Sequence, residues 1–279
     1  MEVESTRRLT EARIGRVHDL LMRILLELDA TTKAAGVSYY LAYGTAIGAV
    51  RHRDFIPWDI DADVFIWSHE YEHLIEALRA RLPEDVTLYT PEDDSGYEYL
   101  FARLGLRGID HTLVHVDLFP LEPAPASRWQ QRVYWIGTRL CCKMYLVKQM
   151  RAGSRTHYTP TKRLVTRVGK IVLSPVPPRV LHRVFTAFTR WFAERSAGEV
   201  VASSCGSYGL REFFRRSWFD AAVPASFRGS ELQIPSGNTE MLEWIYGDFM
   251  TPVPDSVQNR EVEFIEAHFV GPLRSHGIV

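Results

Sequence analysis

The sequence predicts an α+β fold in which a mixed β-sheet core is flanked by helices and carries a largely helical basic segment. Apolar residues recur every three or four positions over 9–35 and 68–82, which indicates helices. Short aromatic or β-branched runs bounded by turn residues indicate strands between and after them. The predicted strands cover residues 38–43, 58–67, 86–90, 97–107 and 112–119.

The composition is that of a globular protein with ample core material. With 279 residues, 46% of them hydrophobic, the chain can form one large domain, or one domain with a subdomain. The net charge of −1 does not favour nucleic acid as a partner. Three cysteines in no paired or zinc-binding spacing indicate a reducing compartment. Without a signal-like or membrane-spanning stretch, we expect a cytoplasmic protein, with peripheral contact at the inner face of the membrane left open.

The stretch 39–67 carries the chemistry. A strand is expected to end at Gly44–Thr45, where the chain turns into a short helix over 45–51 with Thr45 near its N-cap. Backbone N–H groups at a helix start favour a bound anion. Pro57 then prevents helix continuation, and the chain returns as the strand 58–67.

Three aspartates alternate along this second strand. Asp59, Asp61 and Asp63 would share one face, because side chains two apart project from the same side of a strand. At ~3.3 Å per residue, neighbours lie roughly 7 Å apart and the outer pair roughly 13 Å apart. We therefore expect two primary Mg²⁺ ligands, Asp61 and Asp63 first, with Asp59 in a second-ion or outer role. The alternative is a solvated acidic edge or an Asp-rich turn.

A fourth carboxylate interrupts an otherwise apolar strand over 112–119. Asp117 is costly to bury there unless it is paired or binds metal. A neighbouring strand could place it beside the three aspartates, as a further ligand or catalytic group. The alternative is an ion pair with Arg103 or Arg107, and His115 is expected to be a core or outer-shell residue.

The segment 123–193 contains fourteen Lys or Arg and no acid, with helices expected over 127–150 and 178–194. Its uncompensated charge indicates an anionic partner: a polyphosphate donor, an anionic glycan or a membrane surface contacted through 128–190. No recognition motif supports nucleic acid. The expected division is a catalytic core over 1–125, the basic segment over 126–195, and a part over 196–279 that completes the catalytic domain.

Three blocks resemble the LicD family, which includes bacterial phosphocholine transferases and fukutin-like proteins. The first is YYLAYGTAIGAVRHRDFIPWDIDAD at 39–63, the second is VDLFPLE at 116–122, and the third spans 227–252 with its Ile-Pro and Tyr-Gly-Asp elements. The chain departs from the family pattern at Ile60 and at Ala42–Tyr43, and we expect Tyr43 to alter the donor pocket.

The resemblance implies a nucleotidyltransferase-like fold and a Mg²⁺-dependent transferase, with Mn²⁺ as the alternative ion. Gly44 and Thr45 would hold donor phosphates, and Asp59, Asp61, Asp63 and Asp117 would bind metal, with Asp61, Asp63 and Asp117 catalytic. Arg51 and Arg53 would clamp phosphate oxygens, the alternative for Arg51 being a surface ion pair.

The implied reaction moves a phospho-substituent, such as phosphocholine or a polyol phosphate, from a nucleoside-diphosphate-linked donor of the CDP type to a hydroxyl. The acceptor would be a glycan, a lipid-linked or a small molecule, as in cell-surface glycan modification. Nucleotidyl transfer from a nucleoside triphosphate to a sugar phosphate, polyol phosphate or phosphonate would need much the same site. A non-catalytic protein that binds anionic membranes or glycans is the second alternative.

Overall fold

The structure is a computed structural model that describes residues 2–92, 96–150 and 159–279, with the side chains of 2–11 and 160 left aside. The chain forms two compact units. Unit 1 comprises Met1–Leu88, Arg103–Leu118 and Ser217–Val279, and unit 2 comprises Tyr89–Ala102 and Phe119–Arg216. The α+β fold class is confirmed, whereas the division at 125 and 195 stays a prediction.

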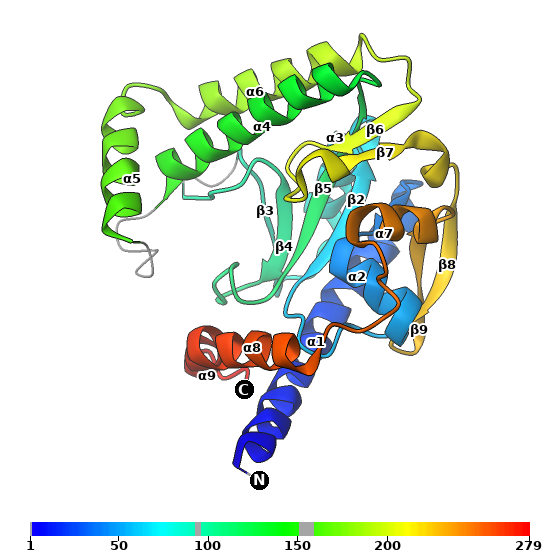
Figure 1. Cartoon of the computed structure of the whole chain (residues 1–279), viewed down its shortest axis with the longest axis vertical. Coiled ribbons are helices and arrows are strands. Elements are labelled where there is room, and N and C mark those ends of the chain that lie inside the picture. Colours follow the sequence, from blue (N-terminus) through cyan, green and yellow to red (C-terminus); the bar gives the residue numbers. More distant parts are fainter. Residues whose placement is uncertain (1, 93–95, 151–158) are drawn as a thin grey trace. The chain divides into compact units, whose positions relative to one another are not determined.

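Unit 1 is built around a sheet with the strand order β1-β2-β5-β4-β3 (Figure 1). The strands are β1 Tyr39–Leu41, β2 Ala62–Trp67, β3 Val86–Tyr89, β4 Ala102–Leu106 and β5 His115–Ala124. β1 is antiparallel to β2, with Tyr40 opposite Phe65. Nearly every residue of β2, β4 and β5 is buried, as expected of central strands covered on both faces.

Two long helices of unit 1 follow the apolar periodicity of the sequence. α1 (Glu2–Ala35) buries Val17, Leu21, Leu25 and Leu28 and packs against α3 (Ser68–Arg81), which buries Leu74, Ile75 and Leu78. Both predicted helices are confirmed. The left-handed backbone of Gly36 follows the end of α1, in agreement with the predicted stop.

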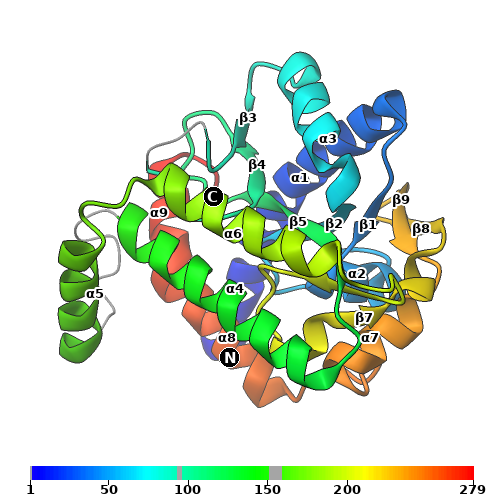
Figure 2. The ribbon, with the colours of Figure 1, turned by 90° about the horizontal axis from the view of Figure 1, so that it is seen from above.

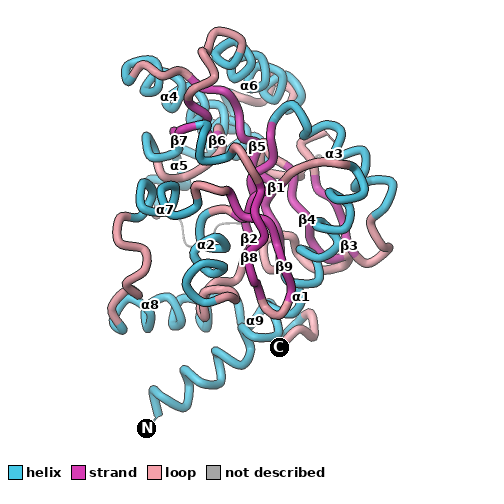
Figure 3. The backbone as a smooth tube through the Cα atoms, turned by 90° about the vertical axis from the view of Figure 1, so that its right-hand side faces the viewer, coloured by secondary structure: helices cyan, strands magenta, loops and turns pink. Residues whose placement is uncertain are grey.

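The C-terminal part of unit 1 adds a hairpin and four helices. β8 (Ala222–Phe227) and β9 (Ser230–Pro235) form the hairpin, and β9 contacts β1 (Figure 3). A 3-10 turn (Arg216–Phe219) precedes it; α7 (Asn238–Tyr246), α8 (Asp255–Ile265), a π-helical stretch (Glu266–Val270) and α9 (Gly271–Ser275) follow. The Tyr40 hydroxyl donates to the Phe219 carbonyl at 3.0 Å, which fixes this part against β1.

Unit 2 holds three helices and the second half of β5. These are α4 (Arg128–Gln149), α5 (Pro160–Val172) and α6 (Pro178–Ala193); the prediction did not separate α5. β5 pairs with β6 (Val200–Ser203), and β6 pairs with β7 (Phe213–Arg215) after a 3-10 turn at Gly209–Glu212. α4 and α6 lie side by side (Figure 2). Their core joins Tyr134, Phe192 and Phe213.

Some local predictions are wrong. Residues 97–101 and 112–114 are not strands, and β2 begins at Ala62, so Asp59 and Asp61 precede it in irregular backbone. Of the predicted acidic turn at 92–94, residues 93 and 94 lie outside the described residues, as do 151–158 of the basic segment. Within the described ranges, no helix combines the length and apolar character that crossing a bilayer requires. The compartment stays a prediction.

Candidate active site

Asp63 lies within electrostatic range of three further aspartates, Asp59, Asp61 and Asp117. Asp63 is the second residue of β2, Asp117 is the third residue of β5, and Asp59 and Asp61 lie in the loop that leads into β2. Burial raises the pKa of Asp63 well above its ordinary value, and the charges of Asp61, Asp117 and Asp59 raise it further. The predicted convergence of Asp117 with the other three is therefore present, although the regular strand spacing is not.

Asp59 is enclosed by three parts of unit 1. A Cβ atom on Gly44 would lie 2.5 Å from Asp59 Oδ2, so only glycine leaves room for this carboxylate. The Asp59 carbonyl accepts a hydrogen bond from His18 Nε2 at 2.7 Å, and the His18 ring stacks on Phe55 at 4.6 Å. Burial, then the neighbouring charge of Asp61, raises the pKa of Asp59 well above its ordinary value.

The Gly44–Thr45 segment is helical and is bound directly to β2. Helix α2 (Tyr43–Ile47) continues into a π-helical stretch (Gly48–His52), and its N-cap is Ala42. The predicted N-cap role of Thr45 is wrong, because Thr45 lies inside α2 and its Oγ1 accepts from the Asp63 N–H at 2.8 Å. The Ala42 N–H also donates to the Asp63 carbonyl, at 2.9 Å. Thr45 therefore positions Asp63, and its contact with donor phosphates stays a prediction.

Asp117 forms the predicted alternative, a buried ion pair with Arg103. Arg103 Nε and Nη2 donate to the two Asp117 oxygens at 2.5 and 2.9 Å, and Nη1 donates to the His111 carbonyl at 2.9 Å. Burial raises the pKa of Asp117, and Arg103 opposes that shift. This carboxylate is held by the guanidinium, and its role as a metal ligand or base stays a prediction.

His115 lies between Asp61 and Asp117, a position that suits the predicted outer-shell residue. Its Nε2 is 3.7 Å from Asp61 Oδ2 and 4.0 Å from Asp117 Oδ1. Burial, then the charge of Arg103, lowers its pKa to about 3, so the ring is neutral near pH 7. Among the described residues, its buried Nδ1 has no hydrogen-bond partner.

The two arginines predicted to clamp phosphate differ in their surroundings. Arg51 Nη1 donates to the Phe249 carbonyl at 2.6 Å and Nε donates to His52, so its guanidinium joins the π-helical stretch Gly48–His52 to the segment after α7. The alternative of a surface ion pair for Arg51 does not match these contacts. Arg53 is exposed and has a left-handed backbone with φ of 54°. Its role toward phosphate stays a prediction.

Sequence reasoning missed the residues that hold the loop 53–59. Arg228, at the turn of the β8–β9 hairpin, donates to both oxygens of Asp54 at 3.0 and 3.1 Å and to Asp19 at 2.6 Å. Its backbone N–H also donates to the Arg53 carbonyl at 2.7 Å. The available signal was its place between Phe227 and Gly229, two residues of the third resembling block. The other missed residue, His18, sits in an ordinary amphipathic helix.

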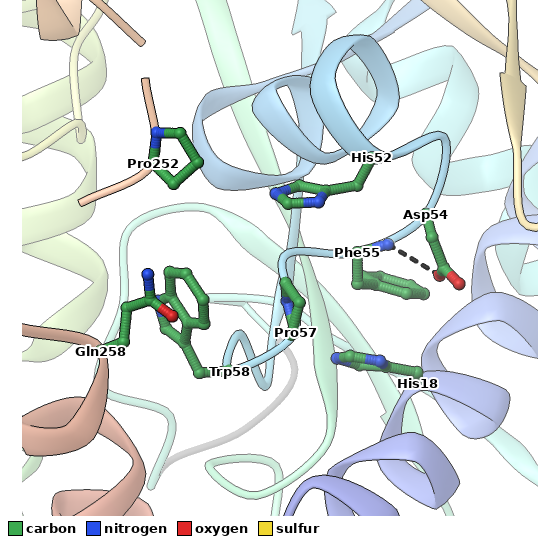
Figure 4. A pocket seen from close by; sticks show the side chains of 8 residues that line it. All are labelled: His18, His52, Asp54, Phe55, Pro57, Trp58, Pro252 and Gln258. Carbon is green, nitrogen blue, oxygen red and sulfur yellow. Dashed lines mark hydrogen bonds between the residues drawn. The ribbon is translucent and has the colours of Figure 1, made fainter. Parts of the chain in front are cut away.

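A pocket of unit 1 opens beside this loop (Figure 4). It has a volume of about 610 Å³, within the range of small-molecule sites. Trp58, the residue before Asp59, and Gln258 line one part of it, while His52 and Pro252 lie near each other at another part. His18 and Phe55 form the opposite wall. The pocket thus combines aromatic, imidazole and amide groups.

The carboxylate set suits Mg²⁺ in its chemistry, although no complete cage of protein ligands is present. Within the described ranges, no three Asp, Glu, His or Cys side chains are grouped closely enough to enclose a metal ion. Mg²⁺, however, commonly takes only one or two carboxylates and completes its shell with water and substrate phosphates. A pair drawn from Asp59, Asp61 and Asp63 therefore fits this ion, whereas Asp117 is already paired.

Comparison with known proteins gives a matching family model and three relatives. Residues 36–151 match the model described as "LicD/FKTN/FKRP, nucleotidyltransferase domain". The chain is 23% identical over 255 residues to the lipopolysaccharide cholinephosphotransferase LicD of Haemophilus influenzae, covering 85% of this chain and 91% of that protein. Ribitol 5-phosphate transferase FKRP is 35% identical over 95 residues in Mus musculus and 36% over 97 in Homo sapiens. These two matches cover 33% of this chain and 18% of either relative.

The relatives are all named as transferases of a phosphorus-containing group, and the present chain is an enzyme of that class. More narrowly, the region that contains all four aspartates matches the LicD family model, in agreement with the predicted resemblance.

Proposed function

We propose that the protein transfers a phospho-substituent from a nucleoside-diphosphate-linked donor to an acceptor hydroxyl. The observation that carries this proposal is the convergence of Asp59, Asp61, Asp63 and Asp117 in unit 1. So many carboxylates in one place repel one another unless a cation or a substrate group offsets them. The relatives are named for choline phosphate and ribitol phosphate, so a polar alcohol phosphate is the transferred group.

Asp61 and Asp63 are the proposed Mg²⁺ ligands. The Asp61 side chain is 42% exposed, which leaves it open to a bound substrate, and Asp63 is fixed by the hydrogen bonds of its backbone to α2 and to Ala42. Bound there, Mg²⁺ would neutralise charge on the donor phosphates. Asp59 stays outside this pair because Gly44 and the surrounding loop enclose it.

Asp117 and Arg103 then have a positioning role. Their buried, bidentate ion pair keeps a guanidinium and a carboxylate in fixed orientation beside His115. Fixed dipoles and charges of this kind need no reorganisation when charge develops on a transferring phosphoryl group. The pocket beside Trp58 is the proposed place for a part of the donor beyond its phosphates, because it opens one residue before Asp59.

The test is a donor panel with product masses measured. The purified chain is incubated with Mg²⁺, an alcohol or glycan acceptor, and CDP-choline, CDP-ribitol or CTP. The proposal predicts release of a nucleoside monophosphate and gain of the alcohol phosphate by the acceptor. Consumption of the triphosphate alone, with pyrophosphate released, would overturn it in favour of nucleotidyl transfer.

The matched variants are Asp61→Asn and Asp255→Asn. Asp61→Asn removes a proposed ligand charge at nearly constant volume and should lower turnover at least about 100-fold. Asp255 lies exposed at the start of α8, and its substitution should leave turnover unchanged. Equal activity of both variants would contradict the assignment of Asp61.

A further inference from the structure

Helix α5 in unit 2 presents an apolar face that nothing in the described structure covers. Leu164, Val165, Val168, Ile171 and Val172 are between 50% and 68% exposed. At about 100° per residue they fall on one side of the helix, and its basic residues fall on the other. The basic residues are Lys162, Arg163, Arg167 and Lys170. An amphipathic helix normally buries its apolar side, so α5 lacks its apolar partner.

The contacts that hold α5 to α4 leave that face open. Lys148 Nζ of α4 donates to the carbonyls of Leu173 and Ser174 at 3.0 and 2.9 Å, just after α5. Lys170 Nζ donates to the Met150 carbonyl. Both attachments use cationic side chains and main-chain oxygens, so they do not involve the five apolar residues of α5.

Helix α4 is buried on one side and carries exposed apolar residues on the opposite side. Its buried side carries Gln131, Tyr134, Thr138 and Tyr145, which pack inside unit 2. The residues Trp129, Val133, Ile136 and Leu140 recur at steps of four, three and four and lie on the opposite side, between 46% and 65% exposed. The first side packs in the interior of unit 2. The second side is exposed in the described chain and is not part of that packing.

Helix α6 repeats the combination beside α4. Val180, Val184 and Trp191 are 41%, 52% and 49% exposed along one side. Arg179, Arg183 and Arg190 lie exposed along the adjoining side. We call the exposed apolar residues of α4, α5 and α6, with the basic residues beside them, the basic apolar surface.

We propose that the basic apolar surface docks on a lipid bilayer rich in anionic lipids. Helices with apolar residues on one side and Lys or Arg on the other lie in the membrane interface, with the apolar side among the acyl chains and the cations at the head groups. The segment 123–193 has fourteen cations and no acid, so its charge complements an anionic membrane. Trp129 and Trp191 are suited to the interface between the two.

Other occupants fit less well. A second copy of the chain would bring the same uncompensated cations against each other in a symmetric contact, and like charges would oppose it. A soluble phosphate compound would be held by the cations and would leave the apolar residues of α5 in water. A bilayer with anionic head groups satisfies both halves of the surface. The proposal is independent of the transferase reaction, since vesicle binding needs no donor or acceptor.

Sedimentation of the full chain with vesicles tests the docking. Vesicles of phosphatidylcholine alone are compared with vesicles containing about 30% phosphatidylglycerol, a fraction of anionic lipid similar to that of natural anionic membranes. We expect binding to the second type, weaker binding at high salt, and little binding to the first. Failure of the folded chain to bind phosphatidylglycerol vesicles at low salt would overturn the proposal.

Matched variants separate the apolar and electrostatic parts. Leu164→Ser with Ile171→Ser on α5 should weaken binding at least about tenfold, because two apolar side chains no longer enter the bilayer. The control is Met250→Ser with Phe264→Ser, which changes two exposed apolar residues of unit 1 and should leave binding unchanged. If the α5 variant does not fold, Trp129→Ser with Ile136→Ser on α4 takes its place.

The charge variant replaces one exposed arginine on each helix with Gln: Arg132 on α4, Arg167 on α5 and Arg179 on α6. Its control replaces three exposed arginines of unit 1 with Gln: Arg81, Arg260 and Arg274. At about fivefold per charge, the first should weaken binding on the order of 100-fold, and the second should not. Equal binding of variant and control would overturn the assignment to this surface. Light scattering tests whether a second copy of the chain covers the surface instead. If the chain is a dimer that does not bind vesicles, and Leu164→Ser with Ile171→Ser dissociates that dimer, the proposal is refuted.

Discussion

Replacing Gly44 with Ala tests whether the position of the Asp59 carboxylate matters for turnover. The new Cβ would lie 2.5 Å from Asp59 Oδ2, whereas ordinary contacts begin near 3.4 Å, so the carboxylate must move by about 1 Å. Gly44 has no left-handed backbone and lies within α2, so Ala itself fits the backbone. A displacement of this size in a site that depends on positioning costs on the order of 100-fold in rate.

The assay compares turnover with thermal stability. Gly44→Ala should lose about 100-fold in turnover with the melting temperature nearly unchanged, because the atom nearest the new Cβ belongs to a side chain that can move. Gly15→Ala is the matched control: it also lies in a helix of unit 1, with no atom within 4 Å of the added Cβ, and should keep full turnover. Gly44→Ala with the turnover of Gly15→Ala would refute the reasoning that turnover depends on the position of the Asp59 carboxylate.

Three further predictions concern buried charges and backbone strain. Arg103→Met leaves the buried Asp117 carboxylate unpaired and should cost about 3–5 kcal/mol in the free energy of unfolding, measured in urea, while Asp117→Asn added to it should restore part of that loss. Burial raises the pKa of Glu122 in unit 2 from 4.5 to about 7, so the folded state keeps a proton that the unfolded chain releases earlier. Its contribution to stability is therefore full below about pH 4.5 and falls by about 3 kcal/mol as the pH rises through 7. Glu122→Gln should remove this slope from the stability measured between pH 4.5 and 8, and an unchanged slope would contradict the assignment. Arg53→Gly relieves a left-handed backbone and should raise the free energy of unfolding by up to about 1 kcal/mol. Its effect on the KM for the donor shows whether the guanidinium binds phosphate, and no change in KM would exclude that role.

The elements with strong apolar periodicity were predictable from the sequence. The helices over 9–35 and 68–82 follow from local pattern, and the burial of Asp117 follows from its place in an apolar strand. Local pattern was sufficient because each of these elements buries one apolar side, or places a polar residue where burial is costly.

The start of β2 could not be predicted in the same way. Alternating aspartates imitate the period of a strand, yet Asp disfavours strands, and the loop instead follows contacts from distant residues. That loop is held at three points. His18 binds the Asp59 carbonyl, Arg228 binds the Asp54 carboxylate, and the Asp59 carboxylate packs closely against Gly44. The contact between Arg228 and Asp54 joins residues 174 positions apart, and no periodicity within either segment predicts it.

The hydrogen bonds from Arg228 to Asp54 have a consequence for the order in which the protein folds during its synthesis. A nascent chain that has left the ribosome only as far as residue 216 already contains every aspartate of the candidate site. It lacks the hairpin turn that fixes the loop, the Phe219 carbonyl that fixes Tyr40, and the Phe249 carbonyl that fixes Arg51. Contacts of such long sequence separation form late in folding. The loop before β2 therefore reaches its observed conformation only after residues that follow 216 have also been synthesised.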